Sequence, residues 1–465
     1  MLLRFRVSNF QSFDELQTFS MIKGKRLKKH AEHIITEGPV PLLKYTEIFG
    51  ANAGGKSNLI DAVRFARNTI LLGLPNNSLR CFCRVSPDNK TKPSSFEFEI
   101  KIKNKYYSYG FSVILSEKKL IDEWLYQIFP DKGDKEIFVR KIDDGVFTVG
   151  SELDESSKSF FEPYKSLISS DSTKLFLTEA NRYLSSDKAS YPPAANLLSD
   201  VLRWFGESLV LIYPENIATQ YSAFITKENA EKLKTIIRSF GFGITDFTFT
   251  DKKESDLSEF PQFIREKISE LFNSAFSADT AAEKTRARNQ QHTIAFRYNK
   301  DFAIISGKPG SGEYQVQKLQ FKHTAGYELF DFSEESEGTI RLLDLIDILF
   351  TAEDNDVDKI YLIDEISRSL HPQLTYKFVS EYLSAAGNHT QLIVTTHESH
   401  LLNLELLRRD EIWFVDKNHD GVSRLYPLDE FSVRFDKKIG AAYFDGRYGG
   451  IPLFERIYPL TQEKS

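Results

Sequence analysis

The residues best suited to chemistry form one loop, Gly50-Ala51-Asn52-Ala53-Gly54-Gly55-Lys56-Ser57. It matches the pattern G-x-x-x-x-G-K-[ST] and stands between a buried strand predicted over 45–49 and a helix predicted by the apolar spacing from Leu59. Backbone N–H groups at the start of a helix create a fixed positive field for phosphate oxygens, and glycines let the backbone close around them. We therefore expect a nucleoside triphosphate to be bound by Gly50, Asn52, Gly54, Gly55, Lys56 and Ser57.

Two carboxylates follow a second apolar run far along the chain. Lys359 to Ile363 predicts a short buried strand, and Asp364 and Glu365 come directly after it. A parallel strand would deliver Asp364 to the metal side of the phosphates and leave Glu365 facing the γ-phosphate. The pair predicts Mg²⁺ binding and activation of a water molecule.

A third apolar run, Gln391 to Thr396, ends in His397. An imidazole at this place can hydrogen-bond the γ-phosphate or the attacking water. Between the loop and the acidic pair, Ser333 to Thr339 predicts a polar turn that opens a helix, because the apolar residues after it keep helical spacing.

The chain resembles an ABC-type ATPase head of the SMC/RecF/OLD-like branch in the order of its motifs: the phosphate loop, Ser336-Glu337-Gly338-Thr339, Ile363-Asp364-Glu365, Leu370-His371-Pro372 and Thr395-Thr396-His397. Met1 to Phe13 is similar to the first strand of that branch. Leu370 to Pro372 and Tyr443 to Pro452 resemble the RloA-like, abortive-infection ATPases, which are bacterial anti-phage proteins related to the ATPase subunits of Septu- and PARIS-type systems. The resemblance covers residues 1–115 and 325–455. It implies an α/β fold with a mixed core sheet, an antiparallel side sheet and a helical insertion domain.

The resemblance also implies roles at the nucleotide. Lys56 and Ser57 would hold the phosphates of ATP and Mg²⁺, and Asp364 would support the metal. Glu365 would polarise the hydrolytic water, and His397 would be the switch histidine.

Two further residues are expected to act on another subunit. In the family that the chain resembles, Ser336 and Gly338 would complete the γ-phosphate site in trans, which implies a homodimer or higher homo-oligomer with ATP sandwiched between heads. One departure concerns the glutamine that usually senses Mg²⁺ in the first lobe, because no glutamine occurs between Gln17 and Gln127. The residue that replaces it stays open.

The composition limits the classes of protein to which the chain can belong. The chain has 465 residues, 41% of them hydrophobic and 27% charged, as in an ordinary globular protein with a large core. A net charge of −6 gives no general attraction to nucleic acid, so such contact would need a local basic patch. No stretch approaches the length of an apolar membrane span, no signal-peptide core is present, and only Cys81 and Cys83 occur. We therefore expect a cytoplasmic protein.

The motifs divide the chain into three parts. Residues 1–115 are expected to form the N-terminal lobe with the phosphate loop. Residues 116–325 form an insertion, mainly helical with some strands, for oligomer or partner contacts. Residues 326–465 form the C-terminal lobe. Lys23 to His30 is the sharpest basic cluster and reads as a solvated loop, with nucleic-acid contact as the alternative. Cys81 and Cys83 are expected on one face of a strand.

Three functions fit these features. The first is a defence ATPase that controls a separate nuclease or toxin encoded nearby. The second is a RecF-like ATPase of DNA repair or recombination, which would need a basic DNA-facing surface. The third, an intrinsic nuclease of the OLD type, is disfavoured because the sequence after His397 lacks the acidic clusters of a Toprim domain. The nine histidines are scattered, and only His371 and His397 stand at motif positions.

Overall fold

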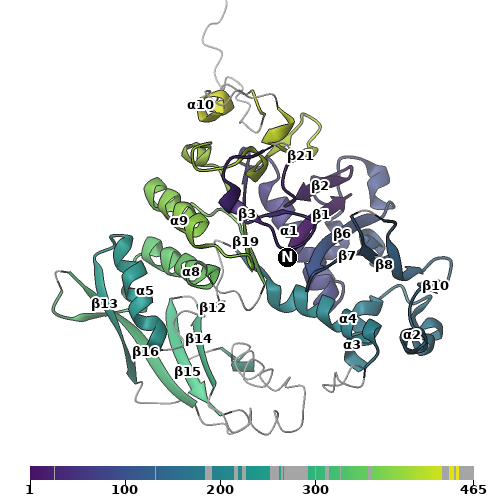
Figure 1. Cartoon of the computed structure of the whole chain (residues 1–465), viewed down its shortest axis with the longest axis horizontal. Helices are drawn as coiled ribbons and strands as arrows, with labels where there is room; N and C mark the ends of the chain where they lie inside the picture. The colour runs from purple at the N-terminus through teal and green to yellow at the C-terminus, as the bar shows by residue number, and fades with distance from the viewer. Residues whose placement is uncertain are drawn as a thin grey trace, which may run out of the picture.

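In the computed structural model, the strand before the phosphate loop lies inside a six-stranded core sheet (Figure 1). The structure describes residues 1–25, 27–130, 132–183, 191–213, 218–221, 227–251, 261–262, 265–266, 292–298, 300–308, 314–324, 326–353, 358–431, 439–444 and 447–449. The core strands are, in spatial order, β11 (Leu209–Ile212), β18 (Lys359–Ile363), β19 (Thr390–Thr396), β5 (Tyr45–Phe49), β20 (Ile412–Lys417) and β21 (Ser423–Pro427). Neighbours from β11 to β20 are parallel, and β21 is antiparallel. The predicted mixed core sheet is confirmed, and the residues that follow β5, β18 and β19 meet at one edge.

Helices cover both faces of this sheet because successive side chains of a strand point to opposite faces. Ile360 and Leu362 of β18 belong to the hydrophobic cluster of α1 (Lys56–Leu72). Tyr361 and Ile363 belong to the cluster on the other face, together with α8 (Glu337–Ala352) and α9 (Pro372–Ala385). The helices after the phosphate loop and after the Ser-Glu-Gly-Thr turn therefore lie on opposite faces.

A second, antiparallel sheet packs its aromatic side chains against α1. Its strands are, in spatial order, β10 (Val146–Val149), β9 (Lys135–Lys141), β8 (Lys119–Ile128), β7 (Lys105–Ile114), β6 (Ser94–Ile102), β1 (Leu2–Ser8) and β2 (Gln17–Ser20). Phe10, Phe65 of α1 and Phe96 have ring centroids 5.1–5.3 Å apart. This confirms the predicted antiparallel side sheet.

The region 116–325 is mixed rather than mainly helical. Its first strands, β8 to β10, extend the side sheet, and β11 is an edge strand of the core sheet. A third, antiparallel sheet contains β12 (Ala218–Tyr221), β14 (His292–Tyr298), β15 (Asp301–Gly307), β16 (Tyr314–His323) and β13 (Ile244–Asp251), with β17 (Leu329–Asp331) beside β16. The described helices of the region are α2 (Glu155–Ile168), α3 (Phe176–Tyr183), α4 (Pro193–Arg203) and α5 (Lys227–Ser239). The strands pair with one another and with both lobes, so the region is not a separate helical unit bounded at 115.

The third sheet is joined to α8 by a buried ion pair. Arg297 of β14 donates to Asp344 of α8 at 2.9 Å, and both side chains are less than a tenth exposed. α5 packs beside α8 on the same side of the core sheet (Figure 1). The insertion therefore contacts the helix that the Ser-Glu-Gly-Thr turn begins.

Three smaller features complete the described chain. β3 (Ile34–Ile35) pairs with β4 (Leu42–Leu43), and α10 covers Ile439–Phe444.

Cys81 and Cys83 are free and lie in a loop after a 3₁₀ turn, so the expectation that they share a strand is wrong. Of the motif from Tyr443 to Pro452, residues 445–446 and 450–452 lie outside the described chain. Within the described chain, none of the helices has the length and apolar character needed to cross a bilayer.

Candidate nucleotide site

The phosphate loop is packed so closely that two of its glycines leave no room for a side chain. A Cβ on Gly50 would lie 2.5 Å from the carbonyl oxygen of Val415, and a Cβ on Gly55 would lie 2.5 Å from the hydroxyl oxygen of Ser423. Gly55 also has a φ of 118°, a left-handed conformation that strongly favours glycine. The loop is thus shaped by its neighbours in β20 and β21 as well as by its own sequence.

A small hydroxyl network holds the loop to the rest of the sheet. Ser423 Oγ lies 2.7 Å from the carbonyl oxygen of Gly54 and 2.7 Å from Ser12 Oγ. Asn58 of α1 donates to Ser12 Oγ at 2.6 Å. These residues come from three distant parts of the chain and form no motif, so no local sequence pattern indicates them.

The Lys56 side chain is hydrogen-bonded to the backbone of the phosphate loop, where the phosphates are expected to bind. Its Nζ donates to the carbonyl oxygens of Gly50 at 2.6 Å and Ala51 at 3.0 Å. Burial lowers the pKa of the Lys56 ammonium, and the carboxylates of Glu365 and Asp364 oppose that effect. The two acids therefore lie close enough to act electrostatically on this lysine.

Two other predicted ligands face outward. Asn52 near the tip of the loop and Ser57 in the first turn of α1 are both exposed. A phosphate over the start of α1 could therefore be reached by the loop N–H groups and by the Ser57 hydroxyl.

The acidic pair stands at the end of β18 and is positioned by Thr395, the first residue of the Thr395-Thr396-His397 motif. Asp364 is buried, and the Thr395 hydroxyl donates to its Oδ1 at 2.6 Å. The same hydroxyl accepts from the backbone N–H of Glu365 at 2.8 Å. Glu365 has a φ of 48°, in the left-handed region that non-glycine residues seldom adopt and that is often found at functional sites.

His397 is exposed and follows β19, which lies between β5 and β18 in the core sheet. The phosphate loop, the acidic pair and the histidine therefore end three neighbouring parallel strands at one edge of the sheet. An attacking water and a γ-phosphate at this edge would lie between a cation, two carboxylates and an imidazole.

Ser336 and Gly338 stand at the start of α8. Ser336 is exposed and caps the helix, its Oγ accepting from the N–H of Thr339 at 3.1 Å. A Cβ on Gly338 would lie 2.8 Å from the carbonyl oxygen of Ser369, in the turn after the acidic pair. α8 and α1 cover opposite faces of the core sheet. Ser336, at the start of α8, and Ser57, in the first turn of α1, therefore belong to helices on opposite faces.

Arg341 is a second positioning residue, and it lies outside the motifs. It is buried one turn into α8, and a guanidinium nitrogen lies 3.4 Å from the carbonyl oxygens of both Asp364 and Glu365. Burial lowers the pKa of Arg341, and Asp344 opposes that effect. The start of α8 is thereby linked to the backbone that carries the acidic pair.

One glutamine does lie near α1, although not where the resemblance leads one to expect it. Gln11 has a φ of 51°, and its Nε2 donates to Asp61 Oδ2 at 3.3 Å. Asp61 lies one turn after Ser57 on the same helix.

The side chains present fit ATP with Mg²⁺. Lys56 supplies a cation among carbonyl oxygens, the loop has no space for larger residues at Gly50 and Gly55, and the metal ligands offered are a hydroxyl and a carboxylate. Mg²⁺ prefers such oxygen ligands together with phosphate oxygens and water.

Two solved structures align over most of the chain. One is an SMC head bound to the C-winged helix domain of ScpA, with 14% sequence identity, a TM-score of 0.41, and 92% of this chain and 97% of that chain covered. The other is the SMC head domain from Thermotoga maritima, with 12% sequence identity, a TM-score of 0.33, and 92% of this chain and 98% of that chain covered. No curated protein sequence matches. A family model matches residues 46–403, a range that contains the phosphate loop, the Ser-Glu-Gly-Thr turn, the acidic pair and His397. The chain therefore belongs to the ATPase family described as "AAA domain, putative AbiEii toxin, Type IV TA system".

Proposed function

We propose that the chain is a switch ATPase that binds ATP with Mg²⁺, hydrolyses it slowly and changes its assembly state as it does so. The observation that carries this proposal is the meeting of Lys56, the Asp364–Glu365 pair and His397 at the ends of adjacent strands of one sheet. Thr395 supports it further, because its hydroxyl joins Asp364 to the backbone of Glu365.

Catalysis in this arrangement consists of positioning and charge stabilisation. Lys56 would neutralise negative charge that develops on the outer phosphates. Glu365 would orient the attacking water, and His397 would hold the γ-phosphate. Bound Mg²⁺ would add positive charge beside Ser57 and Asp364.

We further propose that the active form is a homodimer or higher homo-oligomer with ATP between two heads. Ser336 and Gly338 of one subunit would complete the site of the other. The placement of α1 and α8 on opposite faces of the core sheet supports this arrangement, because one face would carry the phosphate loop and the other the exposed Ser336. Hydrolysis would then depend on assembly, which makes the head a switch.

In the cell, we propose that this switch is the sensor or regulatory subunit of an anti-phage system that controls a separately encoded nuclease or toxin. The motifs shared with abortive-infection ATPases support a defence role. The family description names a toxin of a toxin–antitoxin system, so a competing proposal is that the chain itself is the toxic component. The RecF-like alternative is second, because it would need a basic, DNA-facing surface.

The first experiment tests the ATPase. Lys56→Ala should abolish ATP binding, whereas Glu365→Gln should bind ATP and lower turnover by about 10²–10³. Asp420→Asn, a matched change of an exposed acid in the turn between β20 and β21, should leave turnover unchanged. Turnover in Glu365→Gln above about a tenth of the unmodified protein would contradict the role of Glu365. ATP-dependent dimerisation, measured by light scattering, should be strongest in Glu365→Gln.

The second experiment separates regulator from toxin. The purified chain with ATP and Mg²⁺ should leave DNA, transfer RNA and messenger RNA intact, and its expression alone should not arrest growth. Co-expression with the adjacent gene product should yield a stable complex that depends on nucleotide state. Growth arrest by the chain alone, relieved by the adjacent gene product, would favour the toxin instead.

A further inference from the structure

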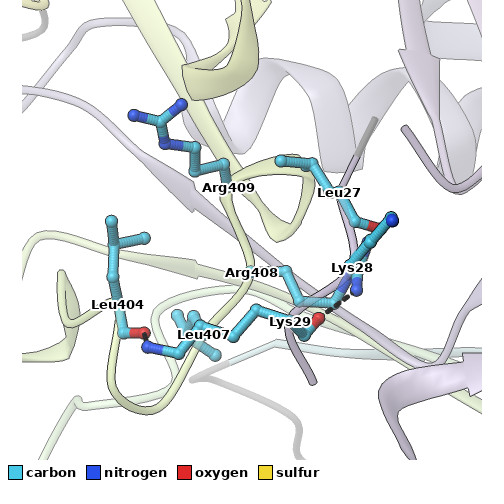
Figure 2. A pocket seen from close by; sticks show the side chains of 7 residues that line it. All are labelled: Leu27, Lys28, Lys29, Leu404, Leu407, Arg408 and Arg409. Atoms are coloured by element: carbon cyan, nitrogen blue, oxygen red, sulfur yellow. Dashed lines mark hydrogen bonds between the residues drawn. The ribbon is translucent and has the colours of Figure 1, made fainter. Parts of the chain in front are cut away.

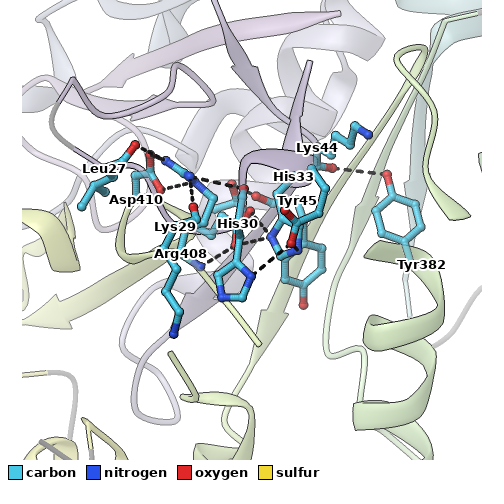
Figure 3. Close-up of polar contacts among 12 residues, drawn as sticks. Leu27, Lys29, His30, His33, Lys44, Tyr45, Tyr382, Arg408 and Asp410 are labelled. Atoms are coloured by element: carbon cyan, nitrogen blue, oxygen red, sulfur yellow. Dashed lines mark hydrogen bonds and ion pairs between the residues drawn. The ribbon is translucent and has the colours of Figure 1, made fainter. Parts of the chain in front are cut away.

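Two histidines and a glutamate converge far from the nucleotide site. His30, Glu32 and His33 form a short H-x-E-H segment around the 3₁₀ turn η1 (Ala31–His33). The imidazoles of His30 and His33 lie next to each other (Figure 3). Their ring centroids are 4.9 Å apart, and the angle between the ring planes is 16°. One ligand atom from each of the three side chains lies within 4.8 Å of the other two.

The hydrogen bonds of each imidazole leave one nitrogen facing the carboxylate. His33 Nδ1 lies 3.0 Å from Oε1 of the fully buried Glu411, and His33 Nε2 lies 3.8 Å from Glu32 Oε1. His30 Nε2 lies 3.4 Å from the carbonyl oxygen of Leu404, and His30 Nδ1 lies 3.2 Å from Glu32 Oε1. The Leu404 carbonyl and the Glu411 carboxylate accept, so each imidazole in its neutral form points a lone pair at Glu32 Oε1. A cation, either a proton on an imidazole or a bound metal ion, would offset the repulsion between these electron pairs.

We propose that His30, Glu32 and His33 bind a divalent transition-metal ion, with Zn²⁺ as the best match. Imidazole nitrogen and carboxylate oxygen are ligands that Zn²⁺ prefers, at about 2.0–2.2 Å. Tetrahedral ligands at that distance are roughly 3.4 Å apart, between the 3.2 Å and 3.8 Å found from Glu32 Oε1 to the two imidazoles. Water would take the fourth position, because Glu32 is exposed.

The hydrogen-bond partners of His30 and His33 resemble those of metal-binding histidines. Metal-binding histidines almost always donate their other N–H to a carboxylate or a backbone carbonyl, and here Glu411 and Leu404 provide one of each. His30 also holds a left-handed backbone conformation, with a φ of 52°, and its ring lies next to that of His33. Such conformations persist where the surrounding structure holds them, often at ligand sites.

The position of the site gives the metal a structural function. The segment before it is fastened to the C-terminal lobe, because Arg408 donates to the carbonyl oxygen of Lys29 and Lys29 Nζ donates to that of Leu404. Beside this contact is a cavity of about 210 Å³ lined by Leu27, Leu404 and Leu407 with two lysines and two arginines (Figure 2). The basic run from Lys23 is thus partly packed rather than a free solvated loop.

The site also lies at the opposite end of the core sheet from ATP. The N–H of Lys44, just before β5, donates to the carbonyl oxygen of His33 at 2.9 Å, and Glu411 directly precedes β20. The phosphate loop follows the other end of β5. The metal would therefore fix where β5 and β20 begin, and it would be independent of the nucleotide.

Zinc titration of the metal-free, full-length protein tests the proposal. With excess Mg²⁺ present and no ATP, the unmodified chain should bind one more Zn²⁺ per chain than Glu32→Gln or His30→Gln, or bind it at least about tenfold more tightly. Co²⁺ in place of Zn²⁺ should give the visible absorption of a four-coordinate site, lost in both variants. His419→Gln, at an exposed turn, should bind like the unmodified chain.

Glu32 is 66% exposed, so Glu32→Gln should fold normally, which thermal unfolding without metal will check. Equal Zn²⁺ stoichiometry and affinity in the unmodified chain, Glu32→Gln and His30→Gln would overturn the proposal. A proton shared by the cluster would then be the cation that holds it.

Discussion

The Thr395 hydroxyl donates to Asp364 Oδ1 at 2.6 Å and accepts from the Glu365 backbone N–H at 2.8 Å. Thr395 of β19 thus positions both Asp364, the proposed metal ligand, and the backbone of Glu365, the proposed catalytic acid, at the end of the neighbouring strand β18. Because Glu365 adopts a left-handed conformation, the hydrogen bond to its N–H helps to hold an otherwise unfavourable backbone geometry.

Thr395→Val should therefore lower ATP turnover by about tenfold or more while the protein stays folded, since partners that orient a metal ligand typically contribute 10–100-fold. Thr390→Val is the matched control at the start of the same strand. Its hydroxyl is buried and has no hydrogen-bond partner among the described residues. Steady-state turnover and Mg²⁺ dependence should change only in the first variant. Equal turnover in the two would contradict the positioning role of Thr395.

Mixing two inactive chains should restore part of the activity if Ser336 acts in trans. A heterodimer of Lys56→Ala and Ser336→Arg contains one composite site with an intact lysine and an intact serine. Turnover should rise above that of either variant alone when the sites fire independently. Ser333→Arg, an exposed change in the preceding turn, should remain active by itself. If demonstrated heterodimers stay inactive, cross-linking of a nucleotide analogue to Ser336 of the Lys56→Ala chain decides between strict coupling of the two sites and action in cis.

The ion pair of Arg297 and Asp344 should matter more for stability than exposed pairs do. Arg297→Met removes one ion-pair partner of a buried carboxylate and should lower the free energy of unfolding by about 3–5 kcal/mol. Arg297→Met with Asp344→Leu should recover most of that loss. Lys232→Met, which breaks the exposed pair with Glu353 at the other end of α8, should cost about 1 kcal/mol or less. Denaturant unfolding of the four proteins completes the comparison, and equal losses in the two single variants would contradict it.

Glu47 should make the folded state less stable as pH rises. Burial raises the pKa of this carboxyl in β5 to about 8, well above its ordinary value of 4.5. Between these two values the folded chain binds more protons than the unfolded chain, so the free energy of unfolding falls with rising pH and levels off above about 8. Glu47→Gln should remove this part of the pH dependence and be relatively more stable at high pH. Parallel profiles from pH 5 to 9 for the two proteins would contradict the shift.

The local signals in the sequence predicted which residues the core sheet brings together, but not the residues that support them. The phosphate loop, the acidic pair and His397 each follow a short apolar run, and a parallel sheet brings such ends together. Arg341 and Ser423 act through contacts with residues distant in sequence, which no spacing rule reveals. Thr395 stands in a motif, but its role depends on the neighbouring strand. The insertion was misjudged because its strands in 292–323 pair with one another and with β12, β13 and β17, whereas helical spacing is visible within a single segment. His30 and His33 were overlooked because their partners, Leu404 and Glu411, lie on the other lobe.

The order of strands in the core sheet has a consequence for biosynthesis. β5 is made early, and all five of its residues are buried, but both its neighbours, β19 and β20, are made some 340 residues or more afterwards. At about 5–20 residues per second on the ribosome, this hydrophobic segment would wait on the order of half a minute for its first partner. The side sheet, by contrast, needs only residues 2–149 and could form around α1 in the meantime. A nascent chain truncated before β19 would therefore leave the phosphate-loop strand unpaired and prone to self-association.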